Sequence, residues 1–133
     1  MAEDLVSEDD VARLLRGYSA YNRGDYDDLR EFVSDEIVME RVGGQPTIHG
    51  WEAFRAFQDP DAFSWQQIEV HETITNGGKI LVRIHTRARG SVSGVEVSID
   101  GWMVWTMRDH MGVHVLITQD EAEAVRALGL APS

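Results

Sequence analysis

The chain has 133 residues, 43% of them hydrophobic, which is enough for a single domain over residues 1–133 with its own core. A formal net charge of -11 at pH 7 repels phosphate backbones and anionic lipids, so we expect neither nucleic acid nor a membrane as partner. The absence of cysteine excludes disulfides and cysteine-bound metals. The acidic start, MAEDLVSEDD, has no secretory signal pattern and no apolar run is long enough to span a membrane, which predicts a cytoplasmic protein.

Helices are predicted first along the chain. Ser7 followed by Asp10 is typical of a helix N-cap, and apolar residues then recur at helical spacing as far as Tyr21. Gly24 suits the left-handed position that ends a helix, and Asp25 can cap a second, short one. The remaining elements predicted before residue 60 are a strand at residues 37–42 and a helix at residues 51–58.

From Trp65 onward the apolar residues alternate with a period of two, which is typical of strands. Short turns separate the predicted strands and favour an antiparallel meander. Asp120 then begins a brief helix that Gly129 ends. Helices followed by a sheet indicate an α+β fold with helices on one face of the sheet. The four predicted strands are residues 65–75, 79–90, 95–108 and 113–118.

Several runs of residues together resemble one known family. YNRGDY at residues 21–26 leads into EFVSDEIVM at residues 31–39, and IHGWEAF follows at residues 48–54. Later runs, WTMRD at residues 105–109 and QDEA at residues 119–122, fit the same pattern. The chain thus resembles the SnoaL-like (polyketide cyclase-like) branch of the nuclear transport factor two-like superfamily. This resemblance implies a cystatin-like cone, in which a strongly curved antiparallel sheet wraps around N-terminal helices. It also implies an apolar pocket in the open end and a homodimer through the outer sheet face.

The superfamily includes ketosteroid isomerases, whose catalytic positions can be compared with this chain. Aligned without gaps, the position of the oxyanion-binding tyrosine falls at Gly17, and that of the base carboxylate at Arg41. A shift of one residue would place Glu40 at the base position, and the protonated acid falls at about Met103. The ungapped alignment retains none of these roles, so the isomerase mechanism is not supported.

The limonene epoxide hydrolases of the same superfamily use an Arg-x-Asp pair, which Arg83-Ile84-His85 matches only in part. No acidic residue near Ile117 matches their second aspartate. Strand alternation argues further against this mechanism. Burying unpaired cations costs more than burying aliphatic side chains gains, so the basic row should face outward. That row is Leu81, Arg83, His85, Arg87 and Arg89, and the inward row is Ile80, Val82, Ile84, Thr86 and Ala88.

A few polar residues remain as candidates for chemistry. Tyr18 and Tyr21 can donate hydroxyl protons to a carbonyl or enolate oxygen, or their rings only fill the apolar stripe. Arg41 has the strand parity of Met39, so it either points inward toward a carboxylate or reaches solvent at the strand end. A histidine such as His49 can move protons near neutral pH, although a loop histidine is more often an ordinary surface residue. The histidines lack metal-ligand spacing, so we expect no metal and no cofactor.

Two functions fit these observations, and a third, a protein-interaction module like the transport factor itself, would require an exposed apolar patch beyond the dimer face. The first is a small-molecule-binding SnoaL-like domain of unknown specific activity, with an apolar pocket for a hydrophobic ligand and no catalytic carboxylate set. The alternative is an enzyme (a cyclase, isomerase or dehydratase) that performs acid/base chemistry on an apolar, carbonyl-bearing molecule through Tyr21, Arg41 and His49. The sequence leaves open whether the chain is an enzyme. In both cases the expected partners are a hydrophobic small molecule and a second copy of the chain. The residues predicted to line the pocket are Tyr18, Met39, Trp51, Phe54, Trp65, Met103, Trp105 and Met107.

Overall fold

Helices and strands alternate early in the chain and give way to long strands later. The computed structural model describes residues 6–41, 45–58 and 63–129. The helices are α1 (Glu8–Arg23), the 3-10 helix η1 (Tyr26–Glu31), α2 (Trp51–Gln58) and α3 (Glu121–Leu128). The strands are β1 (Val33–Arg41), β2 (Ile48–His49), β3 (Phe63–Asn76), β4 (Lys79–Gly90), β5 (Glu96–Arg108) and β6 (Met111–Thr118).

The predicted ends of α1 are confirmed. Ser7 Oγ accepts a hydrogen bond from the N–H of Asp10, and the Asp10 carboxylate accepts one from the N–H of Ser7. Gly24 ends the helix at a φ of 81°, where a side chain would be strained. Asp25 occupies the N-cap position of η1, as predicted, but its side chain makes no cap hydrogen bond. The Asp25 carboxylate lies 3.0 Å from Nε of Arg23 instead.

The six strands form one sheet in the order β2-β1-β6-β5-β4-β3. Strands β3 to β6 form the predicted antiparallel meander. Strand β1 differs from the expectation of a wholly antiparallel sheet, because it lies parallel to β6, with Met39 beside Val115. It also begins at Val33 rather than at residue 37, with an irregular register between Val33 and Val38. The two-residue β2 was not predicted.

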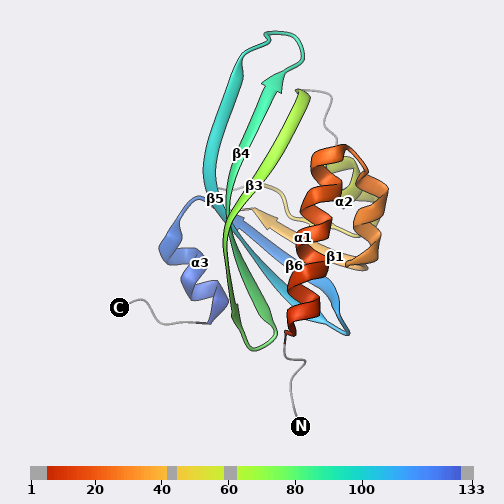
Figure 1. Cartoon of the computed structure of the whole chain (residues 1–133), viewed down its shortest axis with the longest axis vertical. Coiled ribbons are helices and arrows are strands. Elements are labelled where there is room, and N and C mark those ends of the chain that lie inside the picture. The colour runs from red at the N-terminus through yellow and green to blue at the C-terminus, as the bar shows by residue number, and fades with distance from the viewer. Residues whose placement is uncertain (1–5, 42–44, 59–62, 130–133) are drawn as a thin grey trace.

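Helices pack against both faces of the curved sheet (Figure 1). The helices α1, η1 and α2 cover the side that holds the main hydrophobic core, which gives the cone-shaped α+β fold. The helix α3 lies on the opposite face, where Ala124 and Leu128 pack with Leu81 and Val104. The expectation that all helices lie on one face is therefore wrong, because the apolar side chains of α3 need cover of their own. Within the described residues, no helix is long and apolar enough to cross a membrane.

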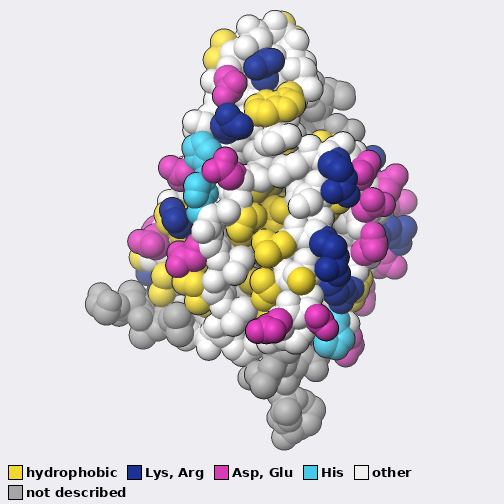
Figure 2. Space-filling view, viewed as in Figure 1, with side chains coloured by type: hydrophobic (Ala, Val, Ile, Leu, Met, Phe, Trp, Pro, Cys, Tyr) yellow, Lys and Arg dark blue, Asp and Glu magenta, His cyan; other side chains and the backbone are white. Residues whose placement is uncertain are grey.

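The alternation along β4 follows the prediction. Ile80, Val82 and Ile84 are buried on the core side, whereas Arg83 and Arg87 are exposed on the outer side. The strands β3, β4 and β5 extend together beyond the end of β6 (Figure 1). Viewed from the same direction, a strip of apolar side chains lies in the middle of the molecular surface, with basic side chains beside it (Figure 2).

Candidate ligand-binding site

A hydrogen-bonded group of three buried side chains lies between α1 and β5. Nε1 of Trp105 donates to the hydroxyl oxygen of Tyr18 at 3.0 Å, and that hydroxyl donates to Sδ of Met103 at 3.0 Å. Tyr18 and Met103 are each 6% exposed and Trp105 is 2% exposed. We call Tyr18, Met103 and Trp105 the inner polar group. It offers a protein donor to a ligand oxygen in the core, as does the hydroxyl of Tyr21, which lines the same cavity.

Local periodicity brings these side chains together. Tyr18 and Tyr21 are three residues apart on α1, so their rings lie on the same face of the helix. Met103 and Trp105 are two residues apart on β5, so they share the core face of the sheet, opposite Val82 and Ile80 of β4.

The space beside the inner polar group is small. A cavity of about 20 Å³ remains, which is room for about one water molecule. Any larger ligand therefore requires core side chains to move, and Met103, with its flexible thioether, moves most readily. The cavity is lined by Gly17, Tyr18, Tyr21, Leu29, Phe32, Phe54, Gln58, Ile68, Met103 and Trp105.

Both inward phenols are neutral at physiological pH. Burial raises the pKa of Tyr18 well above its ordinary value, although the hydrogen bond from Trp105 opposes the rise. Burial also raises the pKa of Tyr21, and the neighbouring Tyr26 adds to the effect. These phenols therefore act as hydrogen-bond donors and not as bases.

The described residues that line the cavity include no carboxylate and no imidazole. A general base must lie within hydrogen-bond reach of the proton that it takes. The cavity can thus bind and polarise an oxygen atom, but its described lining supplies no group that abstracts a proton at neutral pH.

Most residues that were predicted to line the pocket lie in one core cluster. Tyr18, Phe54, Met103 and Trp105 line the cavity itself. Met39, Trp51 and Met107 are buried in the same cluster without lining the cavity. Of the three residues predicted to be catalytic, only Tyr21 lines it.

Trp65 lies on the other face of the sheet. It pairs with Arg89 across β3 and β4, after an irregularity in register between Phe63 and Trp65. The guanidinium carbons of Arg87 and Arg89 lie 5.4 and 5.9 Å from the centre of its ring. These cations hold the indole ring on the outer surface, away from the cavity.

Arg41 and Glu40 are separated by strand parity. Arg41 pairs with Ile117 on the core side of the sheet, where Nη2 donates to the carbonyl of Pro46 at 3.0 Å and the guanidinium lies over Phe57. Its buried Nε has no hydrogen-bond partner among the described residues. Glu40 lies on the outer side, 2.7 Å from Nε2 of His114. The one-residue shift that would bring Glu40 inward is therefore absent.

His49 is exposed at the end of β2 and does not approach the inner polar group. It lines a surface depression with Arg30, Asp35 and Trp51, beside the start of α2. Within this depression Arg30 pairs with Asp35 at 2.5 Å and lies over the ring of Trp51. The structure thus places Tyr21, Arg41 and His49 in three separate surroundings.

Sequence reasoning missed Asn22, which fixes one wall of the cavity. Its side-chain Nδ2 donates to the carbonyl of Ile68 at 2.8 Å, and its Oδ1 accepts from the N–H of Ile68 at 2.7 Å. Asn22 thereby completes the free edge of β3 as a strand neighbour would. Its position in the YNRGDY run indicated only the end of a helix.

Gly17 and Phe32 were also missed as a packing pair. A Cβ at Gly17 would lie 1.9 Å from Cε1 of Phe32, so only glycine lets that ring lie across the helix. The ring of Phe32 packs edge-on to Trp105, with 5.5 Å between centroids. Phe32 thereby closes the cavity on the side of η1.

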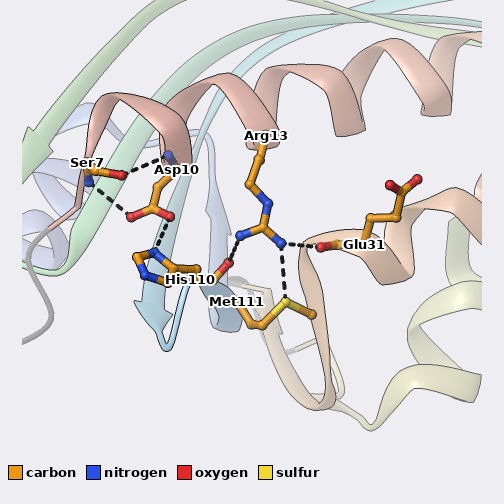
Figure 3. Close-up of polar contacts among 6 residues, drawn as sticks. All are labelled: Ser7, Asp10, Arg13, Glu31, His110 and Met111. Carbon is orange, nitrogen blue, oxygen red and sulfur yellow. Dashed lines mark hydrogen bonds and ion pairs between the residues drawn. The ribbon is translucent and has the colours of Figure 1, made fainter.

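A second polar cluster attaches α1 to the turn between β5 and β6 (Figure 3). Nδ1 of His110 lies 2.9 Å from Oδ1 of Asp10, whose side chain is only 3% exposed. Arg13 donates to the backbone carbonyl of His110 at 2.6 Å and to that of Glu31. His110 itself has a φ of 65°, which is unusual for a residue other than glycine. The cluster holds the helix that carries Tyr18 in place.

Comparison with known families gives the identity of the domain. The model of the SnoaL-like domain matches residues 11–115, and the chain belongs to that family. The resemblance seen in the sequence is thereby confirmed. No curated protein matches the chain.

Several solved structures share the fold. An NTF2-like protein of unknown function from Burkholderia pseudomallei has 20% identity and a TM-score of 0.76, covering 92% of this chain and 98% of that one. The epoxide hydrolase/cyclase-like enzyme SalBIII of salinomycin pyran ring formation has 16% identity and a TM-score of 0.76, covering 86% and 93%. A Mycobacterium tuberculosis protein in complex with estradiol-17beta-hemisuccinate has 15% identity and a TM-score of 0.72, covering 84% and 93%. These identities establish likeness of fold alone.

Proposed function

We propose that this chain binds a hydrophobic small molecule that carries a carbonyl group, with the ligand oxygen accepting a hydrogen bond from Tyr18. The observation that carries the proposal is the inner polar group, a neutral phenol and an indole N–H buried among apolar side chains beside a cavity. A few polar groups within an apolar surrounding are typical of small-molecule sites. The similar Mycobacterium tuberculosis structure, which is in complex with estradiol-17beta-hemisuccinate, supports a small-molecule ligand.

Binding requires an exchange of hydrogen-bond acceptors. In the structure the hydroxyl of Tyr18 donates to the Met103 sulfur, a weak acceptor. A ligand carbonyl is a stronger acceptor, and a thioether side chain changes rotamer easily. The ligand therefore displaces Met103 from the hydroxyl, while Trp105 continues to donate to the Tyr18 oxygen and strengthens its donor character.

Titration with 2-acetylnaphthalene, an uncharged aromatic ketone, tests the proposal. The reporter is the indole N–H signal of Trp105 in nitrogen-15 NMR spectra, assigned with Trp105→Phe. We expect a saturable shift, and about 2- to 10-fold weaker binding by Tyr18→Phe, because a neutral hydrogen bond contributes about 0.5–1.5 kcal/mol. Tyr26→Phe is the matched control, since the hydroxyl of Tyr26 lies outside the cavity near Gln66. No saturable shift, or equal affinity for Tyr18→Phe, would contradict the proposal.

An enzyme acting on a similar molecule is the second candidate. Two neutral, buried phenols favour it, because they could stabilise an enolate oxygen. Exchange of the methyl protons of 2-acetylnaphthalene in deuterated water tests this activity directly. Exchange above the buffer rate that is lost in Tyr18→Phe would support an enzyme, whereas exchange at the buffer rate would leave a binding domain. The catalytic roles suggested for Tyr21, Arg41 and His49 stay predictions.

We also propose that the chain forms a homodimer, as its family resemblance implies. Exposed aliphatic side chains on β5 support self-association, because Val97 and Ile99 are 45% and 48% exposed. These side chains lie on the core side of the sheet and not on the outer face that the resemblance implies. Sedimentation across a concentration series measures this state. A cytoplasmic location stays a prediction of the sequence.

A further inference from the structure

Strand β5 has an open edge along the half that extends with β4 and β3 beyond the end of β6 (Figure 1). Its other half pairs with β6, and this pairing ends where Trp102 meets Thr118. Within the described part of the chain, no strand pairs with residues 96–101 on that side. We call residues 96–101 the open β5 edge.

The direction of the backbone groups along this edge follows from the β4–β5 pairing. The N–H of Gly90 donates to the carbonyl of Val95 at 2.9 Å, and the register continues from there without a shift. In an antiparallel pair, alternate residues turn both their N–H and C=O to the same neighbour. Val97 and Ile99 therefore bond to β4. The residues whose backbone groups point to the open side are Glu96, Ser98 and Asp100.

The open β5 edge has few of the features that protect a strand from pairing. Natural edges are often blocked by charged side chains, especially lysine, by proline or by a covering segment. The sequence EVSIDG has neither lysine nor proline, and its charged residues are Glu96 and Asp100. On the core side of the sheet, Val97 and Ile99 leave nearly half of their surface in water. Covering them removes apolar surface from water.

The acidic side chains on the outer side of the hairpin have basic neighbours. Glu96 lies 3.6 Å from Arg89 and 4.0 Å from Arg87, and Asp100 lies 2.6 Å from His85. The chain as a whole carries a net charge of -11, which opposes the approach of a second copy. The two arginines beside Glu96 lower that repulsion locally.

We propose that the open β5 edge pairs with the same edge of a second copy, antiparallel about a two-fold axis at Ser98. Only this register matches every open residue with another open residue, because it places Ser98 opposite the partner's Ser98 and Glu96 opposite the partner's Asp100. Residues opposite one another share a face of the sheet. The carboxylates of Glu96 and the partner's Asp100 therefore meet on the outer side and repel one another, with Arg87 and Arg89 beside Glu96 to offset the repulsion. Val97 therefore meets the partner's Ile99 on the core side.

The ends of the open edge fit this register. It places Val95 opposite the partner's Gly101, which has no side chain to obstruct the approach. The next pair in this register would be Gly94 and the partner's Trp102. It does not form, because Gly94 has a φ of 70° and has left the strand, and because Trp102 already pairs with β6 in its own chain. The length of chain available for pairing therefore ends at the same point on both copies.

Analytical ultracentrifugation of the full chain without ligand tests the interface with two variants. Ser98→Pro removes an N–H that faces water in a monomer, and proline is tolerated there at an edge. Ile99→Lys places a cation in the apolar contact. We expect each variant to raise the dimer dissociation constant at least about tenfold. Ile74→Lys is the matched control, because Ile74 is a similarly exposed aliphatic residue, 38% exposed, on β3.

The interface rests on the proposed homodimer, and the outcomes separate the two. A wild-type chain that stays monomeric would overturn both. A dimer that neither variant weakens would overturn the interface and leave a dimer through another surface. Urea unfolding identifies a variant that does not fold. If Ser98→Pro does not fold, the test of the interface is the comparison of the dimer dissociation constants of Ile99→Lys and Ile74→Lys. The titration with 2-acetylnaphthalene follows the indole signal of Trp105 in the core. A failure to bind the ketone therefore leaves the measured dimer dissociation constants unaffected.

Discussion

The indole Nε1 of Trp105 and the hydroxyl of Tyr18 are joined by a hydrogen bond of 3.0 Å in the core, where neither side chain is more than 6% exposed. A helix residue and a strand residue 87 positions apart thereby share one polar contact. Because this hydroxyl is also the proposed donor to a ligand, the bond connects the stability of the core with the function of the site.

Removing the Tyr18 hydroxyl leaves the indole N–H of Trp105 buried without an acceptor. We expect Tyr18→Phe to lower the free energy of unfolding by about 1–3 kcal/mol, the cost of an unsatisfied buried donor. Urea unfolding measures this loss. The double variant Tyr18→Phe with Trp105→Phe serves as a cycle, and its loss should be smaller than the sum of the two single losses. Additive losses would show that the hydrogen bond contributes nothing.

Adding a methyl group at Gly17 should destabilise the chain although alanine favours helices. The new Cβ would lie 1.9 Å from Cε1 of Phe32, so the ring must move out of its site against Trp105. We expect Gly17→Ala to cost about 1–3 kcal/mol through overpacking. Thermal unfolding measures the change. In a Phe32→Leu background the same substitution should be neutral or stabilising, and an equal cost there would contradict the packing explanation.

The pairing of Asp10 makes stability depend on pH in the acid range. Burial by itself would raise the pKa of Asp10, but hydrogen bonds from Ser7 and His110 outweigh it and hold the pKa below its ordinary value. A carboxyl whose pKa is lower in the folded than in the unfolded chain stabilises the fold at pH values above its pKa in the unfolded chain. This contribution is lost as the pH falls through its pKa in the folded chain. We therefore expect wild type to exceed Asp10→Asn in stability at neutral pH by about 1.5–3 kcal/mol.

Urea unfolding at a series of pH values measures the difference between wild type and Asp10→Asn. It should shrink as the pH falls below about 4, since the carboxylate becomes protonated. Asp9→Asn is a neighbouring control on the exposed side of α1. A difference that stays constant down to pH 3 would show that the ionised Asp10 carboxylate does not stabilise the fold.

The two buried phenols should make the fold sensitive to alkali. Their pKa values are raised by burial, so their contribution to stability is complete below the ordinary tyrosine pKa of about 10 and is lost as the pH rises further. We expect the unfolding midpoint in urea to fall above pH 10, and to fall less in Tyr21→Phe than in wild type. An identical dependence on pH in both proteins would exclude Tyr21 as a source.

Alternation and capping signals in the sequence were sufficient for most of the fold. The period of two along β4 placed Ile80, Val82 and Ile84 in the core, because a strand with one buried face must segregate its charges. Ser7 and Gly24 marked the ends of α1 through local backbone chemistry. The parallel pairing of β1 with β6 was missed, because it joins residues distant in the chain that no local pattern relates.

The sequence by itself determined the family, the helices and strands, and the apolar character of the core, since these follow from residue type and spacing. Only the tertiary structure decided which polar atoms meet. It joined Tyr18 to Trp105, set Arg41 apart in contact with Pro46 and Phe57, and turned Trp65 outward. Such contacts depend on strand register and on the packing of rings across helices, which are set by the sum of many weak interactions over the whole chain.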